Sequence, residues 1–361
     1  MIAEQLTLDS SPHLHSGPST PRIMWSMTAS LVPTAAWGVW LFGLHALAVV
    51  AAALVGSLAG EAFVGILRRR STLWDGSAAA SGLVIGCLMP PGVPIYVPIA
   101  ASLFAMIVVK GSFGGLGANW MNPGAAGQAF AFISWPAGMS AWGQMQPAVR
   151  PSGGGHTLPP LSAYVSMPSQ SPSAARGTPI HILSLLHYPT TNIGDGAANW
   201  VSSALHSTVN PLGFDLVLGT AIGWIGAVSL LLVVAGGVFL IALGFVGWRI
   251  PVAYAASFVI ALLCLGGIRD GMLLRGGSVL FQIAAGGFLF GAFFLVNDPA
   301  TSPLTKRGAV VYGAGLGVLT AVLRMFGHAE ESVVFAVLLM NIVVPLINLA
   351  AERRRGGERL S

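Results

Sequence analysis

The chain has 361 residues, of which 54% are hydrophobic and 8% are charged, and its mean hydropathy is +0.77. These values exclude an ordinary soluble globular domain and predict a polytopic membrane protein. The two cysteines, Cys87 and Cys264, both lie in apolar runs, so we predict neither a disulfide framework nor a metal or iron–sulfur site in this chain.

The N-terminal segment, residues 1–22, is polar and acidic. It lacks the basic region and the apolar core of a cleaved signal peptide. We therefore predict a cytoplasmic N-terminal tail over 1–22 that leads into a retained first span.

Ten apolar stretches follow that can cross, or nearly cross, a hydrocarbon core of about 30 Å. They predict an all-α integral membrane protein. Three of the stretches are short and are interrupted by Gly or Pro, which predicts broken helices near the centre of the fold. The predicted spans are 23–42, 44–67, 76–89, 94–109, 122–136, 224–246, 250–266, 277–296, 308–325 and 332–349.

A long connection over 137–213, rich in Pro, Ser and Gly, divides the spans into five-helix groups over 23–136 and 214–350. A connection of this length is either disordered or functional. Because each group has an odd number of spans, related groups enter the membrane in opposite orientations, and we predict two inverted repeats. The segment "LMPPGVPIYVP" after the third span matches "LVNDPATSPLTKRG" after the eighth in position.

The distribution of Lys and Arg predicts the orientation. With both termini in the cytoplasm, twelve of the 17 basic residues lie inside and five lie outside, which is the positive-inside pattern. The 137–213 connection is then extracytoplasmic and 351–361 is a basic cytoplasmic tail. The net charge of +5 fits anchoring at an anionic leaflet and requires no nucleic acid. The inner twelve are Arg22, Arg68, Arg69, Arg70, Lys110, Arg249, Lys306, Arg307, Arg353, Arg354, Arg355 and Arg359.

A first polar cluster occurs in "GSFGGLGANWMNPGAAGQAF", residues 111–130, where Gly114, Gly115 and Gly117 precede Asn119 and Asn122. Glycine lets the backbone approach a ligand closely, and each amide both donates and accepts hydrogen bonds. The proline of "NWMNP" is suited to the first position of a helix. Two interpretations stay open, a ligand site at a helix break and a pair of capping or stapling asparagines.

A second polar cluster, "NDPATSP", follows the eighth predicted span and contains Asp298 and Thr301. In isolation it is typical of a helix cap at the cytoplasmic interface. In two inverted repeats it meets the first cluster, and both then face one central ligand.

Two further carboxylates, Glu61 and Asp75, lie in or beside the membrane. Carboxylates at such depths serve cation pathways in many membrane proteins. The alternatives are that Glu61 extends to the surface and that Asp75 caps a helix after "RRRSTLW".

Five ordered motifs carry a family resemblance: "DGSAAASGLVIGCLMPPGVP", "GGLGANWMNPGAAGQAFAFISWPAGMSAW", "DLVLGTAIGWIGAVS", "NDPATSPLTKRGAVVYG" and "LLMNIVVPLIN". Together they resemble the D subunit of the Rnf ion-translocating ferredoxin:NAD oxidoreductase and the homologous B subunit of the sodium-translocating NADH:quinone oxidoreductase. The resemblance covers nearly the whole chain outside the long connection. The N-terminal "SPHLHSGPSTPRIMW" is similar to the Rnf branch.

The resemblance implies a multi-pass subunit of the bacterial cytoplasmic (inner) membrane. Its complex would couple electron transfer between ferredoxin and NAD to the translocation of Na⁺ or H⁺, with flavin (FMN, riboflavin or both) as carrier. The implied partners are other membrane and peripheral subunits, including iron–sulfur and flavin subunits, so the chain alone is not a complete enzyme. A solute channel or transporter with inverted repeats, and a structural anchor for redox partners, remain the alternatives.

The resemblance also implies a flavin environment formed by Gly114, Gly115, Gly117, Asn119, Asn122, Asp298 and Thr301. No nucleotide-binding fingerprint accompanies it, because "GAGLGV" at 313–318 lies inside an apolar span rather than after a strand. We therefore expect NAD to bind another subunit.

The resemblance also bears on whether a flavin is covalently attached to this chain. Relatives carry FMN joined through its phosphate to the threonine of a Ser-Gly-Ala-Thr-type motif in the outer connection. The best counterpart here is "NWVSSALHST", in which Leu205 takes the threonine position and Thr208 is the nearest threonine. Because leucine has no hydroxyl, we expect loss of the covalent link and non-covalent flavin between the halves, rather than transfer of the link to Thr208.

Overall fold

A computed structural model describes residues 19–69, 72–141, 192–205, 211–221, 223–270, 279, 282–284, 287–326 and 331–358. Within these ranges the chain is helical and contains no strand, which confirms the predicted all-α class. The first-half elements are α1 (Thr20–Phe42), α2 (Leu44–Arg68), η1 (Leu73–Asp75), α3 (Ser77–Cys87), α4 (Tyr96–Phe104), the π-helix η2 (Ala105–Gly111), α5 (Pro123–Ser134) and α6 (Pro136–Met139). The later elements are α9 (Asn192–Leu205), α10 (Pro211–Leu218), α11 (Leu230–Ala242), α12 (Arg249–Asp270), α14 (Phe288–Phe290), the π-helix η4 (Gly291–Leu295), α15 (Lys306–Phe326) and α16 (Ser332–Glu358).

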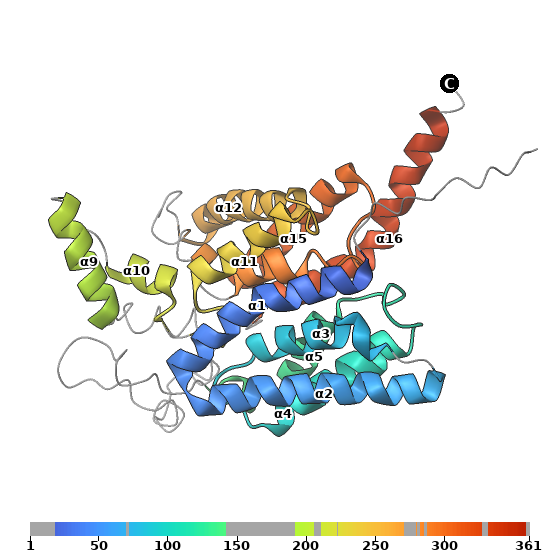
Figure 1. Ribbon diagram of the computed structural model, residues 1–361. Helices are drawn as coiled ribbons and strands as arrows, with labels where there is room; N and C mark the ends of the chain where they lie inside the picture. Colours follow the sequence, from blue (N-terminus) through green and yellow to red (C-terminus); the bar gives the residue numbers. More distant parts are fainter. Residues whose placement is uncertain are drawn as a thin grey trace, which may run out of the picture.

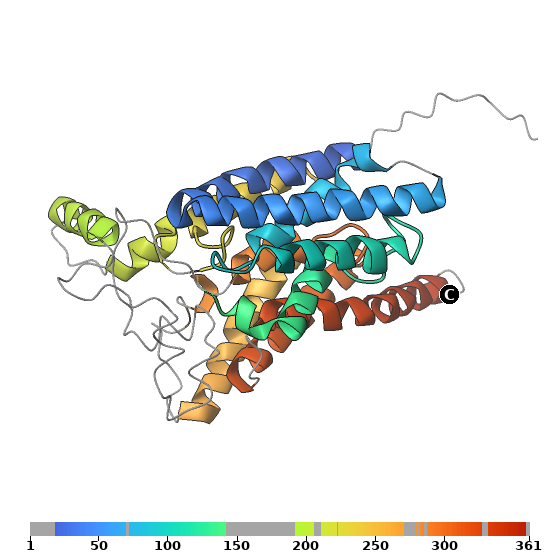
Figure 2. The same ribbon diagram turned by 90° about the horizontal axis from the view of Figure 1, so that it is seen from below.

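The helices form two groups that meet along α1 and α5. In the first group α2 packs on α3 and α4, and in the second α12 packs on α15, which also contacts α16. Figure 1 shows the first group below and the second above, with α1 at the boundary against α11. The view from below in Figure 2 shows α16 passing α5, the second contact between the groups. The broken helices α3, α5 and α14 with η4 therefore lie in the interior.

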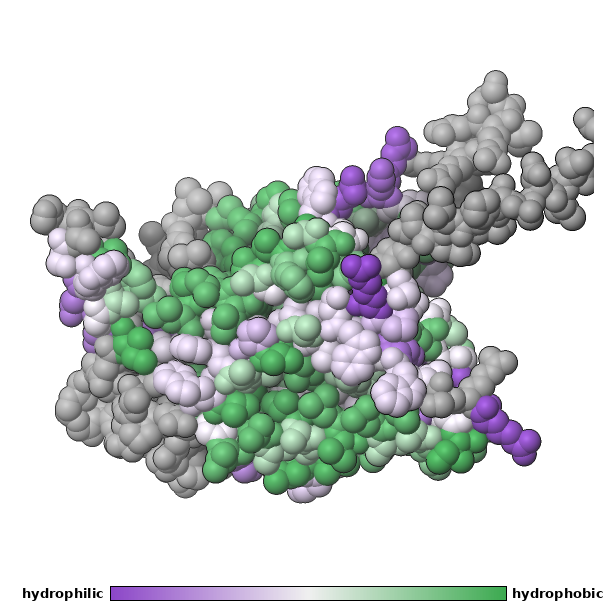
Figure 3. Space-filling model, in the orientation of Figure 1, coloured by the Kyte–Doolittle hydropathy of each residue, from purple (hydrophilic) through white to green (hydrophobic). Residues whose placement is uncertain are grey.

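The apolar lengths fit a membrane protein. By length and composition α2, α15 and the Ser332–Ala351 part of α16 can cross a membrane, and four further apolar helices are shorter. The exposed surface in Figure 3 is largely hydrophobic over the helices, with hydrophilic residues gathered towards the end of the molecule at which α16 leaves. These features support a multi-pass membrane protein.

The predicted span 224–246 is wrong at its start, because α11 begins only at Leu230. The preceding backbone crosses the end of α3 instead: the N–H of Ile225 donates to the Met89 carbonyl (3.2 Å) and that of Gly226 to the Cys87 carbonyl (2.7 Å). A Cβ at Gly226 would lie 2.3 Å from the Cys87 Cβ. The first half thus satisfies the backbone donors that a helix would have satisfied internally.

Other boundaries are closer to prediction. The first two predicted spans match α1 and α2. The predicted span 277–296 is only partly described; its described residues are helical at Phe288–Phe290 and Gly291–Leu295, with short helical pieces before them. The 137–213 connection contains the amphipathic helix α9, and α10 begins inside it at Pro211. Figure 1 shows α9 and α10 extending from the side of the bundle.

Paired glycines allow neighbouring helices to pack closely. On α2, a Cβ at Gly56 would lie 2.9 Å from the Ile99 carbonyl oxygen of α4, and a Cβ at Gly60 would lie 2.8 Å from the Met106 Cβ of η2. On α15, the first and last glycines of "GAGLG" likewise face α12. Small residues four apart allow such contacts in membranes, so this motif serves helix packing.

Candidate functional site

Asn122 joins the two halves of the molecule. It is the N-cap of α5, where its Oδ1 accepts from the Ala125 N–H at 3.0 Å and Pro123 takes the first helical position. Its Nδ2 donates to the Leu295 carbonyl at 3.0 Å, at the end of η4. The capping interpretation is therefore confirmed for Asn122, and the same side chain also makes an interhalf contact.

The glycine loop before α5 positions Asn119. Gly114, Gly115 and Gly117 have φ values of 122°, 98° and 90°, a region that other residues rarely adopt. The N–H of Gly117 donates to the Asn119 Oδ1 at 3.3 Å, and the Asn119 Nδ2 donates to the Met121 carbonyl at 3.1 Å. Asn119, 4% exposed, is thus fixed at the helix break.

Asp298 meets this loop from the second half. Its side chain is buried, accepts from the Thr301 Oγ1 at 3.2 Å and lies close to the Asn119 side chain. The backbone N–H groups of Thr301 and Ser302 close the turn by donating to the Asp298 carbonyl. The structure brings the two polar clusters together, as the sequence predicts for a central site.

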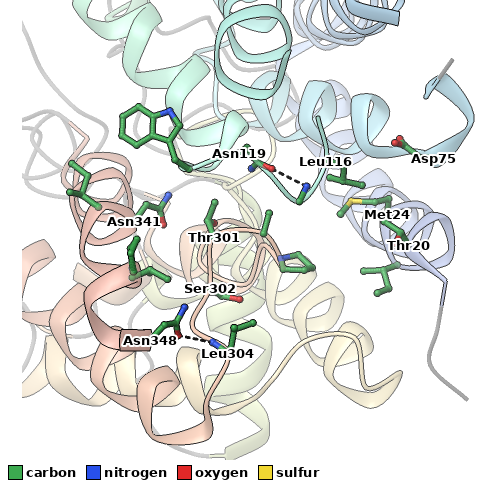
Figure 4. A pocket seen from close by; sticks show the side chains of 18 residues that line it. Thr20, Met24, Asp75, Leu116, Asn119, Thr301, Ser302, Leu304, Asn341 and Asn348 are labelled. Carbon is green, nitrogen blue, oxygen red and sulfur yellow. Dashed lines mark hydrogen bonds between the residues drawn. The ribbon is translucent and has the colours of Figure 1, made fainter. Parts of the chain in front are cut away.

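A cavity of about 880 Å³ opens beside this junction. Figure 4 shows the side chains around it, with Asn119 and Leu116 on one side and Asn341, Thr301 and Ser302 on the other. Its polar lining comprises Thr20, Asp75, Asn119, Thr301, Ser302, Asn341 and Asn348. Apolar walls come from Leu116, Trp120, Leu304, Ile342 and Val344. The cavity combines apolar surface with a few convergent polar groups, the usual composition of an organic cofactor site.

A second, much smaller cavity of about 30 Å³ lies next to it. Its polar lining comprises Ser77, Ser81, Lys110, Asn119, Asn122 and Asp298. This volume suits a water-sized occupant and is too small for a flavin ring. Asn119 lines both cavities.

Lys110 is buried within the protein. The charge pattern predicts it at the inner membrane surface, but its side chain is 3% exposed and its Nζ lies 2.8 Å from the Glu61 Oε1. The Nζ also donates to the Ser77 Oγ at 2.6 Å. Glu61 is buried too and accepts from Thr72, so it does not extend to the surface.

Asp75 has two features. Its Oδ1 accepts from the Ser77 N–H at 2.8 Å, as expected of a residue that caps a helix start, and from the Ser77 Oγ. It also lines the larger cavity. Because the Ser77 Oγ donates to Asp75 and accepts from the Lys110 Nζ, a chain of hydrogen bonds joins Asp75 to Lys110.

The predicted site residues therefore fall into five groups. Gly117, Asn119, Thr301 and Asp75 line the larger cavity, and Asn119, Asn122 and Asp298 line the smaller one. Gly114 and Gly115 shape the loop without lining either cavity. Glu61 contacts the smaller cavity through Lys110. Thr208 lies outside the described residues.

Sequence reasoning missed Asn341 and Asn348, which bring α16 to the site. Asn341 hydrogen-bonds Tyr312 at 2.9 Å, and the Asn348 Oδ1 accepts from the Leu304 N–H at 3.1 Å. The available signal was two asparagines seven residues apart in an apolar helix, which places both on one face.

The chain is similar over nearly its whole length to proteins of one family. The model of the NQR2, RnfD, RnfE family matches residues 7–357. The chain is 34% identical to the D subunit of the proton-translocating ferredoxin:NAD(+) oxidoreductase complex of Clostridium ljungdahlii, over 98% of this chain and 96% of that protein. It is 32% identical to the D subunit of the Na(+)-translocating ferredoxin:NAD(+) oxidoreductase complex of Acetobacterium woodii, over 97% and 94%.

A third relative, the D subunit of the ion-translocating oxidoreductase complex of Escherichia fergusonii, is 31% identical over 97% of this chain and 98% of that protein. The match therefore extends across both halves of the bundle and the connection between them, and it confirms the resemblance carried by the five sequence motifs. The chain belongs to the NQR2, RnfD, RnfE family.

Proposed function

We propose that this chain is the D-type membrane subunit of a flavin-dependent complex that couples electron transfer between ferredoxin and NAD to the translocation of Na⁺ or H⁺ across the bacterial cytoplasmic membrane. The observation that carries the proposal is the large cavity at the junction of the two polar clusters, in a chain similar over its whole length to subunits of that name. The other membrane, iron–sulfur and flavin subunits complete the activity.

The coupling ion is either Na⁺ or H⁺ in this proposal. Two relatives with nearly the same identity, 34% and 32%, are named for translocation of protons and of sodium ions respectively. A solute channel would use the same broken helices, but none of these relatives is named as one.

The cavity fits an isoalloxazine. Its volume of about 880 Å³ is within the range of organic ligand sites, about 300–1,000 Å³. Trp120 and Leu116 offer apolar surface to the ring faces, and Asn119, Asn341 and Thr301 offer donors and acceptors to the ring edge and the ribityl hydroxyls. FMN and riboflavin share both parts. A bound flavin would supply one- and two-electron transfer, while these residues bind it, orient it and exclude water.

The proposed inverted repeat has support from helix pairing. In each half the second helix packs on the fourth, α2 on α4 and α12 on α15, and the third is short. A basic residue lies near the end of each fourth helix, the buried Lys110 on η2 after α4 and the partly buried Arg324 in the last turn of α15. Lys110 donates to Ser77 at the start of α3, and Arg324 donates to Gln282 ahead of α14 and to Ser332 at the start of α16.

Orientation is testable by site-directed thiol labelling in intact cells. We expect a cysteine at Ala174 to react with an impermeant reagent from outside, and cysteines at Arg69, Lys306 and Arg354 to react only after permeabilisation, because basic residues flank the inner ends of spans. The cysteines are introduced into a variant in which Cys87 and Cys264 are replaced, so that no native thiol reacts with the reagent. Labelling of Ala174 and Lys306 from the same side would contradict the ten-span inverted repeat.

The absence of a covalent flavin is testable by in-gel fluorescence. We expect the denatured chain to give a dark band although the native protein is yellow, because the position aligned with the acceptor threonine is Leu205. Thr208→Ala is the matched variant. A fluorescent band that this variant abolishes would identify Thr208 as the acceptor and overturn the expectation. A band that persists would overturn it too, and peptide mass spectrometry over Thr157, Thr178, Thr190 and Thr191 would then locate the link.

A further inference from the structure

Lys110 is a buried cation that pairs with a carboxylate of the first half and lines a cavity with a carboxylate of the second half. Its Nζ is 2.8 Å from Glu61 of α2, and its side chain lines the small cavity that Asp298 also lines. An ammonium has three donors, and two of them are used by Glu61 and the Ser77 Oγ. Among the residues that the structure describes, no other Lys or Arg lines this cavity.

The charges of this cluster do not balance. Glu61 and Asp298 together carry two negative charges when ionised, and Lys110 supplies one positive charge. A net charge in a buried site within a membrane protein is costly, so the cluster favours one additional monovalent cation. Two further charged residues lie nearby, Asp75 and Arg68. Asp75 is only partly buried, and Arg68 is exposed and donates to the Gly111 carbonyl. Water can therefore screen both charges, and neither counts toward the charge balance of the buried cluster.

The cavity is suited to a single cation. Its volume of about 30 Å³ admits one water-sized species. The Asp298 carboxylate, the Ser77 hydroxyl and the amide oxygens nearby are hard ligands, which suit Na⁺ or a proton carried by a carboxylate or water. Lys110 lies on the π-helix η2, an irregular backbone of the kind often found at functional sites.

We propose that Lys110 is a positioning residue that acts as the fixed counter-ion of Glu61 and thereby limits this cluster to one transported cation, Na⁺ or H⁺, held at Asp298. The inference rests on the proposed cation translocation and adds the residue that sets the charge capacity of the site. With Lys110 removed, Glu61 becomes a second negative charge that only another cation neutralises.

The test uses the assembled complex in membrane vesicles. Ferredoxin:NAD oxidoreductase turnover is measured against Na⁺ concentration at fixed pH and against pH at fixed Na⁺. In Lys110→Met we expect the half-saturating Na⁺ concentration to fall at least about tenfold, or the midpoint pH to rise by about one unit or more, because an uncompensated buried carboxylate attracts cations more strongly. Lys110→Arg, which keeps the charge, should retain the wild-type dependence.

The double variant Glu61→Gln/Lys110→Met removes the pair together and should return both dependences to wild-type values. A structural role alone predicts a lower amount of complex with unchanged dependences, and that result would overturn the proposal, as would a shift that persists in the double variant. If the Lys110→Met complex does not assemble, the Glu61→Gln complex tests the proposal instead. We expect its apparent affinity for the cation to fall about tenfold, because Lys110 is then an uncompensated positive charge. An unchanged affinity would refute the role of Lys110.

Failure of the two proposals is distinguishable in the same vesicles. A wild-type complex that moves neither Na⁺ nor H⁺ during turnover would remove the proposed function. A wild-type complex that moves a cation, with Lys110→Met showing wild-type Na⁺ and pH dependence, would remove only the role of Lys110.

Discussion

Gly317→Val is expected to prevent accumulation of folded protein. A Cβ at Gly317 would lie 2.0 Å from the Ser257 Oγ, 2.5 Å from the Tyr254 carbonyl oxygen and 2.6 Å from the Phe258 nitrogen. Two of these atoms are backbone of α12 and cannot move without separating α12 from α15. Overpacking typically costs about 1–3 kcal/mol, and a backbone clash exceeds that range.

The measurement is the amount of monodisperse protein in detergent and its thermal unfolding midpoint, with Gly247→Val as the matched control. No described atom lies within 4 Å of a Cβ at Gly247. We expect the control to behave as wild type, and equal stability of the two variants would show that α12 and α15 are not held together by this contact.

The sequence predicts the helices wherever apolar length alone determines them. The first two spans match α1 and α2 within a few residues, because 23- and 25-residue apolar helices separated by Gly43 leave little choice of register. The N-cap and proline of α5 are also predictable, since they depend on local backbone chemistry.

The sequence-based predictions fail where contacts between distant parts of the chain, and not local sequence, determine the structure. The residues before α11 are as apolar as a helix but pair with the end of α3, a contact that no local pattern reports. Lys110 lies near the end of η2, which continues α4, and its charge predicts an exposed residue at the membrane surface. An ion pair with Glu61, 49 positions earlier in the sequence, buries it within the protein instead. A charge count cannot distinguish a buried ion pair from an interfacial anchor.

The candidate site is predictable in part for the same reason. Asn119, Asn122 and Asp298 lie at breaks between helices, where glycine and proline mark irregular backbone. Asn341 lies in the middle of a regular apolar helix, and only the packing of α16 on α5 brings it to the cavity.

Leucine substitutions at Asn119, Asn122 and Asp298 are expected to lower the flavin content of the assembled complex. Asn122→Leu removes both the cap of α5 and the bond to the Leu295 carbonyl. Asp298→Leu removes the acceptor of the Thr301 hydroxyl and a polar neighbour of Asn119. Each loss of a buried polar partner costs about 1–3 kcal/mol, enough to reduce occupancy of a site formed between the halves.

Asn297→Leu is the matched control. Its Nδ2 donates to the Ala292 carbonyl at 2.9 Å, so the substitution also removes a hydrogen bond next to Asp298, but Asn297 lines neither cavity. We expect this variant to keep wild-type flavin content, which separates loss of the site from general destabilisation.

Flavin bound between the two halves is the central claim, and quantification of flavin extracted from the purified complex tests it most directly. We predict a yellow wild-type complex with non-covalent flavin that the Asn119, Asn122 and Asp298 variants lose while their subunit composition and the Asn297→Leu control stay normal. Full flavin occupancy and normal turnover in all three variants would contradict this claim and leave these residues with capping roles alone.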